Sequence, residues 1–298
     1  MKMPNFLVIG TAKGGTTSLY SYLCQHPQIY MSPNKEPGFF ALEGENLDFQ
    51  GPDEAFSKIS ITNIDDYQRL FDGVSQEIAV GEASPFYLYF EKTSERIKHY
   101  IPEAKLIVSL RNPIDRAYAS YMHNVRMGYE EDSFGESLAK EEERIKDNWI
   151  YLWHYKQCGL YYKQLKQYFD TFDASQIKVY LFEELAQSTQ TTVQDIFAFL
   201  GVDDSFIPDL SIVNASGIPK SRLVHSLVDR GNPIRSTLQT VIPVGVRKSV
   251  AQRIRKLNLA PKPPLELELR KTLSDYYRDD ILRLQDLIGR DLSKWLVQ

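Results

Sequence analysis

Short apolar runs alternate along the chain with segments whose apolar residues recur at helical spacing. A buried strand of a parallel sheet is typically short, apolar and rich in β-branched residues, without a polar alternate position. Four runs have this character and predict buried strands: Phe6–Ile9, Ile78–Val80, Lys105–Leu110 and Ile177–Phe182.

Helical patterns lie between and after these runs. Pro113–Met127 is the clearest, because Asn112 is a good N-cap, proline suits the first helical position and Gly128 closes the helix. The other predicted helical segments are Thr17–Gln25, 130–166 (rich in aromatic residues), Ala186–Leu200 and 266–288. Strands that alternate with helices predict an α/β fold, a three-layer sandwich around a central parallel sheet. With no internal repeat visible, we treat residues 1–298 as a single domain with an insertion at 130–166.

Composition narrows the class of protein. The 298 residues include 35 Lys and Arg against 39 Asp and Glu, a net charge of −4, and 43% are hydrophobic. This balance is typical of a globular protein and argues against a nucleic-acid binder, which usually carries a strong positive excess. The first apolar run, Phe6–Ala12, is too short for a signal sequence, and no later run approaches the roughly 18 residues of a membrane span. We expect a cytoplasmic protein that does not bind membranes.

The first strand leads directly into Gly10–Ser18, with the sequence GTAKGGTTS, and then into a helix. Glycines let a backbone turn tightly and approach a ligand, and a helix N-terminus presents N–H groups to an anion. The segment departs from the nucleoside-triphosphatase loop GxxxxGK[ST], because position 16 is threonine and the lysine comes earlier, at position 13. We predict a P-loop-like phosphate site formed by Lys13, Gly14, Gly15, Thr16, Thr17 and Ser18.

A second cationic segment, Arg111–Pro113, follows the strand Lys105–Leu110. Ligands of an open parallel sheet collect at the carboxyl ends of its strands, so Arg111 should face the same crevice as the first loop. Its guanidinium can hold a second phosphate through two hydrogen bonds. The helix that follows carries Arg116, Ser120 and His123 on one face. Two separated phosphate sites predict a ligand with phosphates at both ends of a nucleoside.

These motifs resemble those of sulfotransferases that use 3′-phosphoadenosine 5′-phosphosulfate (PAPS). The first loop resembles their 5′-phosphosulfate-binding loop, and Ser109–Pro113 with its helix resembles their 3′-phosphate-binding segment. The similarity is greatest with the heparan-sulfate N- and O-sulfotransferases and with bacterial and cyanobacterial enzymes, including those embedded in polyketide synthases. Further similar segments, in the same order, are Glu36–Phe40, Gly81–Pro85, Arg116–His123 and Gly217–Arg222.

The resemblance implies an enzyme that transfers the sulfuryl group of PAPS to an acceptor hydroxyl and releases 3′-phosphoadenosine 5′-phosphate (PAP). Glu36 matches the general base of the heparan-sulfate enzymes, and Lys13 would stabilise charge on the leaving phosphate. His123, kept neutral by the nearby cations, would donate to the transferring group or serve as the base itself. No metal is expected. The late loop would cover the cofactor or neutralise its 3′-phosphate with Lys220, Ser221 and Arg222.

One position departs from the family pattern, and two other functions remain open. Ala119 stands where a serine usually contacts the 3′-phosphate, so its neighbour Ser120 becomes the candidate for that contact. The alternative functions are a P-loop-like small-molecule kinase or phosphotransferase and a non-catalytic nucleotide-binding module. The missing Walker lysine and the lack of an obvious magnesium ligand pair argue against the kinase. The presence of both Glu36 and His123 argues against the module.

The segment 230–265 has eight basic residues and no acidic one, although the whole chain is acidic. It is either a solvated basic face or a docking surface for an acidic acyl carrier protein or an anionic saccharide. The aromatic residues of 130–166 either pack in the core or line the acceptor or adenine pocket. The sequence is compatible with three acceptor classes: a saccharide, a small alcohol and a carrier-bound β-hydroxyacyl chain.

Overall fold

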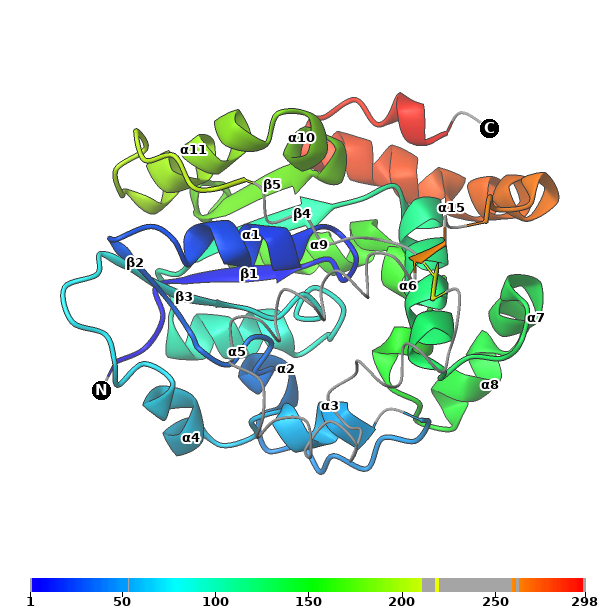
Figure 1. Cartoon of the computed structure of the whole chain (residues 1–298), viewed down its shortest axis with the longest axis horizontal. Helices are drawn as coiled ribbons and strands as arrows, with labels where there is room; N and C mark the ends of the chain where they lie inside the picture. Colours follow the sequence, from blue (N-terminus) through cyan, green and yellow to red (C-terminus); the bar gives the residue numbers. More distant parts are fainter. Residues whose placement is uncertain (1, 53, 211–217, 220–258, 261–262, 297–298) are drawn as a thin grey trace, which may run out of the picture.

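A parallel β-sheet forms the centre of the structure, a computed structural model that describes residues 2–52, 54–210, 218–219, 259–260 and 263–296. The five strands lie in the order β2-β3-β1-β4-β5, and all neighbours are parallel. Helices cover both faces of the sheet (Figure 1), which confirms the predicted three-layer α/β architecture. The strands are β1 (Phe6–Gly10), β2 (Ile29–Met31), β3 (Ala79–Ala83), β4 (Lys105–Leu110) and β5 (Ile177–Leu181).

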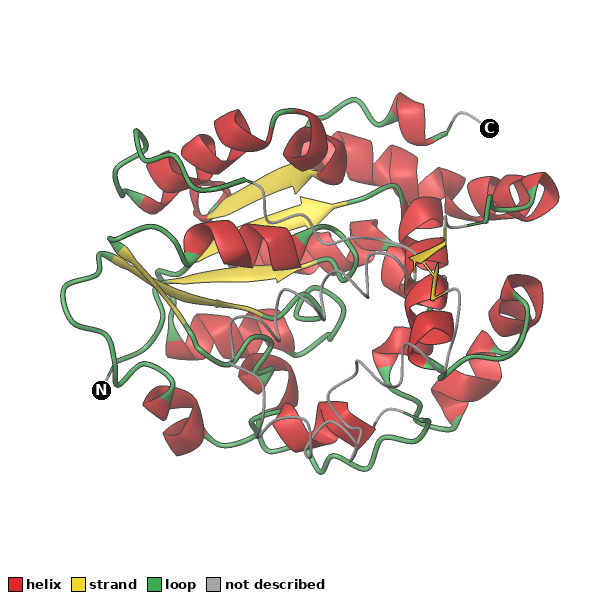
Figure 2. Cartoon of the chain, viewed as in Figure 1, coloured by secondary structure: helices red, strands yellow, loops and turns green. Residues whose placement is uncertain are grey.

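Helices connect the strands and continue beyond the last one (Figure 2). In chain order they are α1 (Thr16–Leu23), α2 (Phe39–Leu42), α3 (Glu54–Ile59), α4 (Ile64–Arg69), α5 (Thr93–Tyr100), α6 (Pro113–Met127), α7 (Phe134–Ala139), α8 (Glu141–Lys146), α9 (Tyr161–Thr171), α10 (Phe182–Gln187), α11 (Thr189–Leu200) and α15 (Leu267–Ile288). Short 3₁₀ turns and a two-stranded antiparallel pair complete the described elements: η1 (Tyr151–Trp153), η2 (Gln157–Gly159), η3 (Ala174–Gln176), η4 (Ser293–Trp295), β6 (Ile218–Pro219) and β7 (Leu259–Ala260). None of the described helices is both long and apolar enough to cross a lipid bilayer.

The central strand β1 is buried on both faces because successive side chains of a strand point to opposite sides. Phe6 and Val8 pack in the layer that contains α1 and α11. Leu7 and Ile9 pack in the larger layer, which contains α5, α9 and α15. All four side chains are fully buried. The continuous apolar run that predicted this strand is therefore required by the two layers that cover it.

The order of the strands creates a crevice at the carboxyl ends of β1 and β4. After β1 the chain crosses to β2 and β3 on one side of it, and then to β4 on the other side. Connections that leave in opposite directions open a gap between the two neighbouring strand ends, where α/β proteins bind ligands. The loop before α1 and the loop before α6 therefore face each other across this gap.

Helix α6 has the predicted bounds because its end signals are local. The side chain of Asn112 accepts hydrogen bonds from the backbone N–H groups of Ile114 (2.9 Å) and Asp115 (3.4 Å). Gly128 ends the helix in the left-handed region, with φ of 78°. Both signals stand in the sequence next to the residues they affect. The predicted start and end of this helix are therefore confirmed.

Several other sequence predictions differ from the structure: the helix predicted over Thr17–Gln25 spans Thr16–Leu23, and the strand predicted over Ile177–Phe182 ends at Leu181. Strand β2 was not predicted, since a strand of three residues leaves little periodic signal. The segment Ala186–Leu200 is not one helix, because Ser188 takes a non-helical conformation (φ −131°, ψ 44°) and separates α10 from α11. Strand β3 begins one residue later than predicted and continues to Ala83 through Glu82, a charged residue that the apolar pattern did not include.

The predicted helical and aromatic segment 130–166 consists of α7, α8, two 3₁₀ turns and the start of α9. Trp153, Tyr155 and Tyr161 are fully buried, so core packing is confirmed for these three. A buried ion pair between Arg144 and Glu130, with N and O 2.6 Å apart, fixes α8 to the chain ahead of α7. The segment packs beside α6.

Candidate functional site

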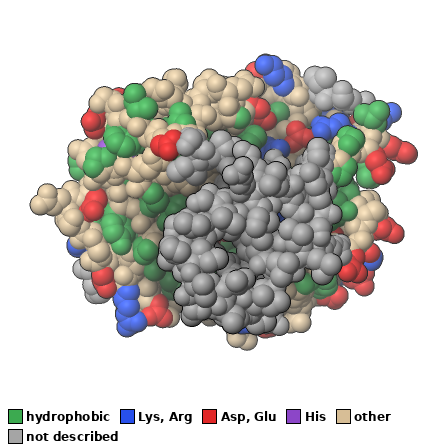
Figure 3. Space-filling view, viewed as in Figure 1, with side chains coloured by type: hydrophobic (Ala, Val, Ile, Leu, Met, Phe, Trp, Pro, Cys, Tyr) green, Lys and Arg blue, Asp and Glu red, His purple; other side chains and the backbone are tan. Residues whose placement is uncertain are grey.

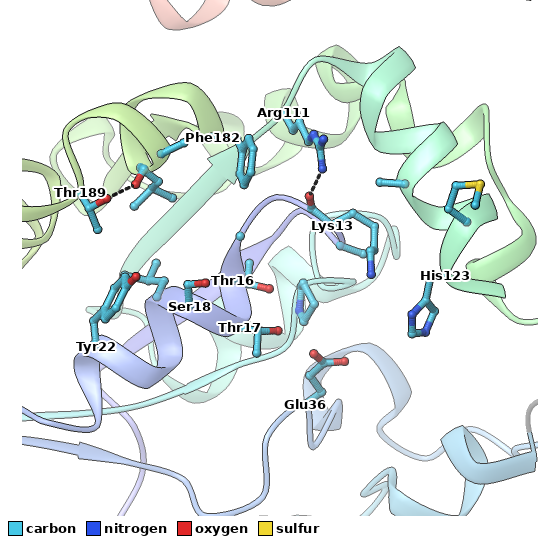
Figure 4. Close-up of a pocket in the computed structure, with 18 of the residues that line it drawn as sticks. Lys13, Thr16, Thr17, Ser18, Tyr22, Glu36, Arg111, His123, Phe182 and Thr189 are labelled. Carbon is cyan, nitrogen blue, oxygen red and sulfur yellow. Dashed lines mark hydrogen bonds between the residues drawn. The ribbon is translucent and has the colours of Figure 1, made fainter. Parts of the chain in front are cut away.

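A cavity of about 900 Å³ opens at the crevice between β1 and β4. Its walls come from the loop after β1, from α1, α6 and α10, and from the turn ahead of α2 (Figure 4). The structure thus brings together most of the predicted site residues, although they come from four separate parts of the chain. Those that line the cavity are Lys13, Gly15, Thr16, Thr17, Ser18, Glu36, Arg111 and His123.

Gly14 lets the first loop lie against the end of β4, and Gly15 lets it turn into α1 beside Phe182. A Cβ atom on Gly14 would stand 2.5 Å from the backbone oxygen of Ser109, so only glycine fits there. The hydroxyl of Ser109 in turn donates to the Gly14 carbonyl oxygen at 2.6 Å. Gly15 has φ of 90° and begins α1. Gly14 does not line the cavity, but it positions its neighbours Lys13 and Gly15, which do.

The first turn of α1 directs its backbone N–H groups at the cavity. Within the described part of the chain, no side chain caps this N-terminus. The hydroxyl-bearing residues Thr16, Thr17 and Ser18 line the cavity beside it. Uncapped N–H groups at the positive end of a helix, flanked by hydroxyl donors, are typical of a site for a phosphate or sulfate group.

Lys13 is the loop's cation, and it lies among other cations. Burial, together with the charges of Arg126 and Arg111, lowers the pKa of Lys13 to about 8, although Glu36 acts in the opposite direction. The amino group points into the cavity between His123 and Glu36 (Figure 4). A half-buried cluster of this kind is strongly electropositive and favours a polyanionic ligand.

Arg111 connects the two predicted phosphate sites. Its Nη1 donates to the backbone oxygen of Lys13 at 3.3 Å, and the hydroxyl of Tyr161 donates to the backbone oxygen of Arg111 at 3.0 Å. The guanidinium lies 4.6 Å from the ring centroid of Phe182, the first residue of α10. These contacts hold the arginine at the mouth of the crevice, beside an apolar surface, as the strand-end argument predicted.

His123 is held as a neutral hydrogen-bond donor. Nη2 of Arg126 lies 2.9 Å from Nδ1 of His123, and a guanidinium can only donate. Nδ1 must therefore accept, which leaves the proton on Nε2. Burial, Lys13 and Arg126 together lower the pKa of His123 to about 3, in agreement with the predicted neutral imidazole. Arg126 was not among the predicted site residues, although a spacing of three residues on one helix places it beside His123.

Glu36 faces these two residues from the opposite wall. Its carboxylate points into the cavity toward Lys13 and His123 (Figure 4). Glu36 has φ of 66° and is followed by Gly38 with φ of 75°, so the backbone turns sharply here. The carboxylate forms an ion pair with Lys35 and keeps 29% of its side-chain surface exposed. A partly exposed carboxylate beside the phosphate-binding loop is suitably placed to accept a proton from a bound acceptor.

Ser120 does not lie at the cavity. It is 3% exposed, and its hydroxyl donates to the backbone oxygen of Leu152 at 3.3 Å. Ala119 lines the cavity instead. One residue along a helix is a rotation of about 100°, which turns Ser120 into the protein interior. Lys220, Ser221, Arg222 and the basic residues of 230–262 lie outside the described residues.

The cavity also has apolar walls, and for Tyr151 they agree with the predicted alternative that aromatic residues of 130–166 line a pocket. Tyr151 of the aromatic segment is buried, and it lines the cavity together with Leu152. Phe182 follows β5 directly, so the strand-end rule that located Arg111 could have located it as well. The remaining apolar lining comes from Ala12, Leu19, Tyr22, Pro85, Ala119, Met122, Leu185, Ala186 and Leu210. Among the described residues, no group of three potential ligands could hold a metal ion.

The fold and the cavity define an α/β protein with a glycine-rich loop ahead of a helix at the carboxyl edge of its sheet. The family model described as "Sulfotransferase domain" matches residues 3–230. The chain therefore belongs to the sulfotransferase family. This membership confirms the resemblance seen in the sequence and favours a sulfotransferase over the kinase alternative.

Individual relatives support the same assignment. A sulfotransferase from Alicyclobacillus acidocaldarius is 40% identical, covers 99% of both chains and superposes with a TM-score of 0.80. The sulfotransferase domain of the Synechococcus olefin synthase shares the fold, with a TM-score of 0.51 and 19% identity over 98% of this chain and 97% of that one. The human bifunctional heparan sulfate N-deacetylase/N-sulfotransferase 3 is 24% identical over all of this chain, which spans 31% of that protein's length.

Proposed function

We propose that this protein is a PAPS-dependent sulfotransferase that transfers a sulfuryl group to an acceptor hydroxyl. One observation carries the proposal. Lys13, the N-terminus of α1 and Arg111 converge on one cavity, and Glu36 and His123 line that same cavity. Two cationic sites for anions and a carboxylate base are what sulfuryl transfer from a bisphosphorylated nucleotide requires.

The residues of the cavity fit PAPS as its cofactor. The phosphosulfate end would lie at the N-terminus of α1 with Lys13, because these groups supply hydrogen-bond donors and a positive charge. Arg111 would hold the 3′-phosphate. The surface formed by Phe182 and Leu185 would accept the adenine ring, since an aromatic face favours a planar base.

The chemistry divides among three side chains. When bound, PAPS supplies an activated sulfuryl group whose leaving group is a phosphate. Glu36 accepts the proton of the acceptor hydroxyl as that oxygen forms its bond to sulfur. Lys13 neutralises the charge that develops on the leaving phosphate oxygen as the other bond to sulfur breaks. His123 would donate its Nε2 proton to the transferring group, because its Nδ1 already accepts from Arg126.

Acceptor panels test this function. The protein is incubated with PAPS and one member of each of three classes: a saccharide, a small alcohol and a β-hydroxyacyl carrier protein. We expect at least one class to yield a sulfated product and an equal amount of PAP, without added metal. Transfer from ATP but not from PAPS would contradict the proposal, and so would the absence of product with all three classes.

We also propose that the basic segment 230–265 attracts an anionic acceptor, either an acidic carrier protein or a charged saccharide. Its eight basic residues contrast with the described surface, where acidic side chains gather along the edge formed by α7 and α8 (Figure 3). Charges of this kind mainly raise the association rate and are screened over about 8–10 Å at physiological salt. KM for the acceptor should therefore rise with salt. A KM that stays constant with salt and after charge reversal of Arg253, Arg255 and Lys256 would contradict the docking role.

A further inference from the structure

A fully buried carboxyl group, Glu82 on β3, lies behind the cavity at the centre of a hydroxyl network. The hydroxyl of Tyr67 donates to Oε1 at 3.3 Å, and the hydroxyl of Ser84 donates to Oε2 at 2.9 Å. The hydroxyl of Tyr87 also bonds to this carboxylate. Glu82 has no cation beside it among these contacts and does not line the cavity. A carboxylate buried in this way is costly unless hydroxyl or amide donors satisfy it.

Two of the hydroxyls connect Glu82 to the turn that carries Glu36. The backbone N–H of Gly38 donates to the hydroxyl oxygen of Ser84 at 3.2 Å. The backbone N–H of Phe40 donates to the hydroxyl oxygen of Tyr87 at 3.3 Å. Each hydroxyl thus accepts from the turn on one side and donates its proton to the carboxylate on the other. Since a hydroxyl has a single proton, Glu82 determines the direction of both chains of hydrogen bonds.

The same turn is anchored by ring contacts on this network. The ring of Phe39 stacks on Tyr67 with centroids 4.5 Å apart, and the ring of Phe40 meets Tyr87 edge to face at 5.7 Å. Glu36 has φ of 66°, a left-handed conformation that a residue other than glycine keeps only where the surroundings impose it, whereas Gly38, with φ of 75°, adopts it readily. The hydrogen bonds from the N–H groups of Gly38 and Phe40 to the hydroxyls of Ser84 and Tyr87 impose this conformation. Glu82 orients both hydroxyls.

We infer that Glu82 is the positioning residue for Glu36: its ionised carboxylate orients Ser84 and Tyr87, which hold the 36–40 turn and keep the Glu36 carboxylate facing the cavity. The inference rests on the proposed function only for its catalytic consequence. Glu82 touches neither acceptor nor cofactor and acts through the backbone of the turn.

The titration of Glu82 should appear in the pH dependence of turnover. Burial raises the pKa of this carboxyl to about 7, with the neighbouring Glu36 acting in the same direction and the hydroxyls of Tyr87, Ser84 and Tyr67 opposing it. A protonated Glu82 cannot accept from all three hydroxyls, so the network loses its order as the pH falls through about 7. The kcat of the wild type should fall along an acidic limb near this pH.

The test compares Glu82→Gln with a matched control, Glu141→Gln. Glu141 is also fully buried and also has a pKa raised by burial, but it accepts from the backbone N–H groups of Lys156 and Gln157, away from the cavity. The first readout is amide hydrogen exchange, which needs neither PAPS nor an acceptor. Exchange at Gly38 and Phe40 should rise by about tenfold or more in Glu82→Gln and stay at the wild-type rate in Glu141→Gln.

The second readout is kinetic, with PAPS and the acceptor that gives the highest turnover. Glu82→Gln should lower kcat by about 10–100-fold, leave the affinity for PAP within about twofold and lack the acidic limb near pH 7. In a Glu36→Gln background the same substitution should change kcat by less than about twofold, because a residue that acts through Glu36 has nothing left to position. Ser84→Ala and Tyr87→Phe, which each interrupt one chain, should show the same pattern with smaller losses.

The outcomes separate this inference from the proposed function. A wild type that transfers no sulfuryl group refutes the function, while hydrogen exchange still decides whether Glu82 holds the turn. Unchanged exchange at Gly38 and Phe40 in Glu82→Gln overturns the inference. It is also overturned if Glu82→Gln lowers kcat in the Glu36→Gln background by as much as it does in the wild type. If Glu82→Gln does not fold, Ser84→Ala and Tyr87→Phe decide by the same two readouts.

Discussion

At the scale of single residues, Lys13 is the group whose charge depends most on the ligand. Its pKa of about 8 in the free cavity reflects burial and the neighbouring arginines. A phosphate or sulfate placed against the amino group supplies the missing counter-charge and raises that pKa again. Binding of an anion and protonation of Lys13 are therefore linked.

This linkage predicts how PAP affinity depends on pH. Above about pH 7 the phosphates of PAP are already ionised, so Lys13 is the group that must gain a proton on binding. As the pH rises above about 8, the affinity should fall by up to about tenfold per unit. Calorimetry across this range measures the slope. Lys13→Arg keeps its charge and should bind without this slope, and a slope that persists in Lys13→Arg would contradict the role of Lys13.

Glu36 and His123 differ in what each can do with a proton. Glu36→Gln should lower kcat by about 10²-fold or more and barely change PAP binding, because it removes the base but no cation. His123→Ala should also lower kcat but keep the acidic limb of the pH profile, since His123 acts as a neutral donor.

A conservative variant separates donation from proton acceptance. His123→Gln places an N–H donor near the position of Nε2 and should retain more activity than His123→Ala. Steady-state kinetics across the pH range measures both variants. If the acidic limb vanished with His123 and survived in Glu36→Gln, the two residues would have to exchange roles.

At the scale of elements, the P-loop-like turn depends on its contact with the end of β4. Gly14→Ala would drive a methyl group into the Ser109 backbone oxygen, which cannot move without disturbing the sheet. We expect PAP affinity to fall by about tenfold or more. Gly135→Ala is the control, because a Cβ atom there meets only Leu269 at 3.7 Å. Equal PAP binding by both variants, measured by calorimetry, would contradict this account of the loop.

The elements also show where sequence reasoning succeeds and where it does not. The bounds of α6 were predictable because Asn112 and Gly128 act on their immediate neighbours. Ser120 was misplaced because its hydroxyl was chosen by residue type, whereas the rotation of the helix turns that side chain inward. The network around Glu82 joins β3, α4 and the 36–40 turn, so it exists only after the chain has folded.

At the scale of the whole molecule, the order of the strands brings the site together. Lys13 follows β1 and Arg111 follows β4. These strands are neighbours because the chain adds β2 and β3 on one side of β1 and then β4 on the other side. The alternating pattern predicted a parallel sheet, and the strand-end rule predicted that the two loops face one crevice. Strand order itself depends on contacts between segments that are far apart in the sequence, which no local pattern encodes.

The central claim is that this cavity binds a nucleotide with both a 5′ and a 3′ anion and needs no metal to do so. The most direct test is calorimetry with PAP and with ATP, each with and without Mg²⁺. We predict that PAP binds without Mg²⁺ and at least about 30-fold more tightly than ATP, the equivalent of losing one buried charge partner worth about 2 kcal/mol. Arg111→Ala should remove most of this preference. ATP binding that equals or exceeds PAP binding and requires Mg²⁺ would contradict the account.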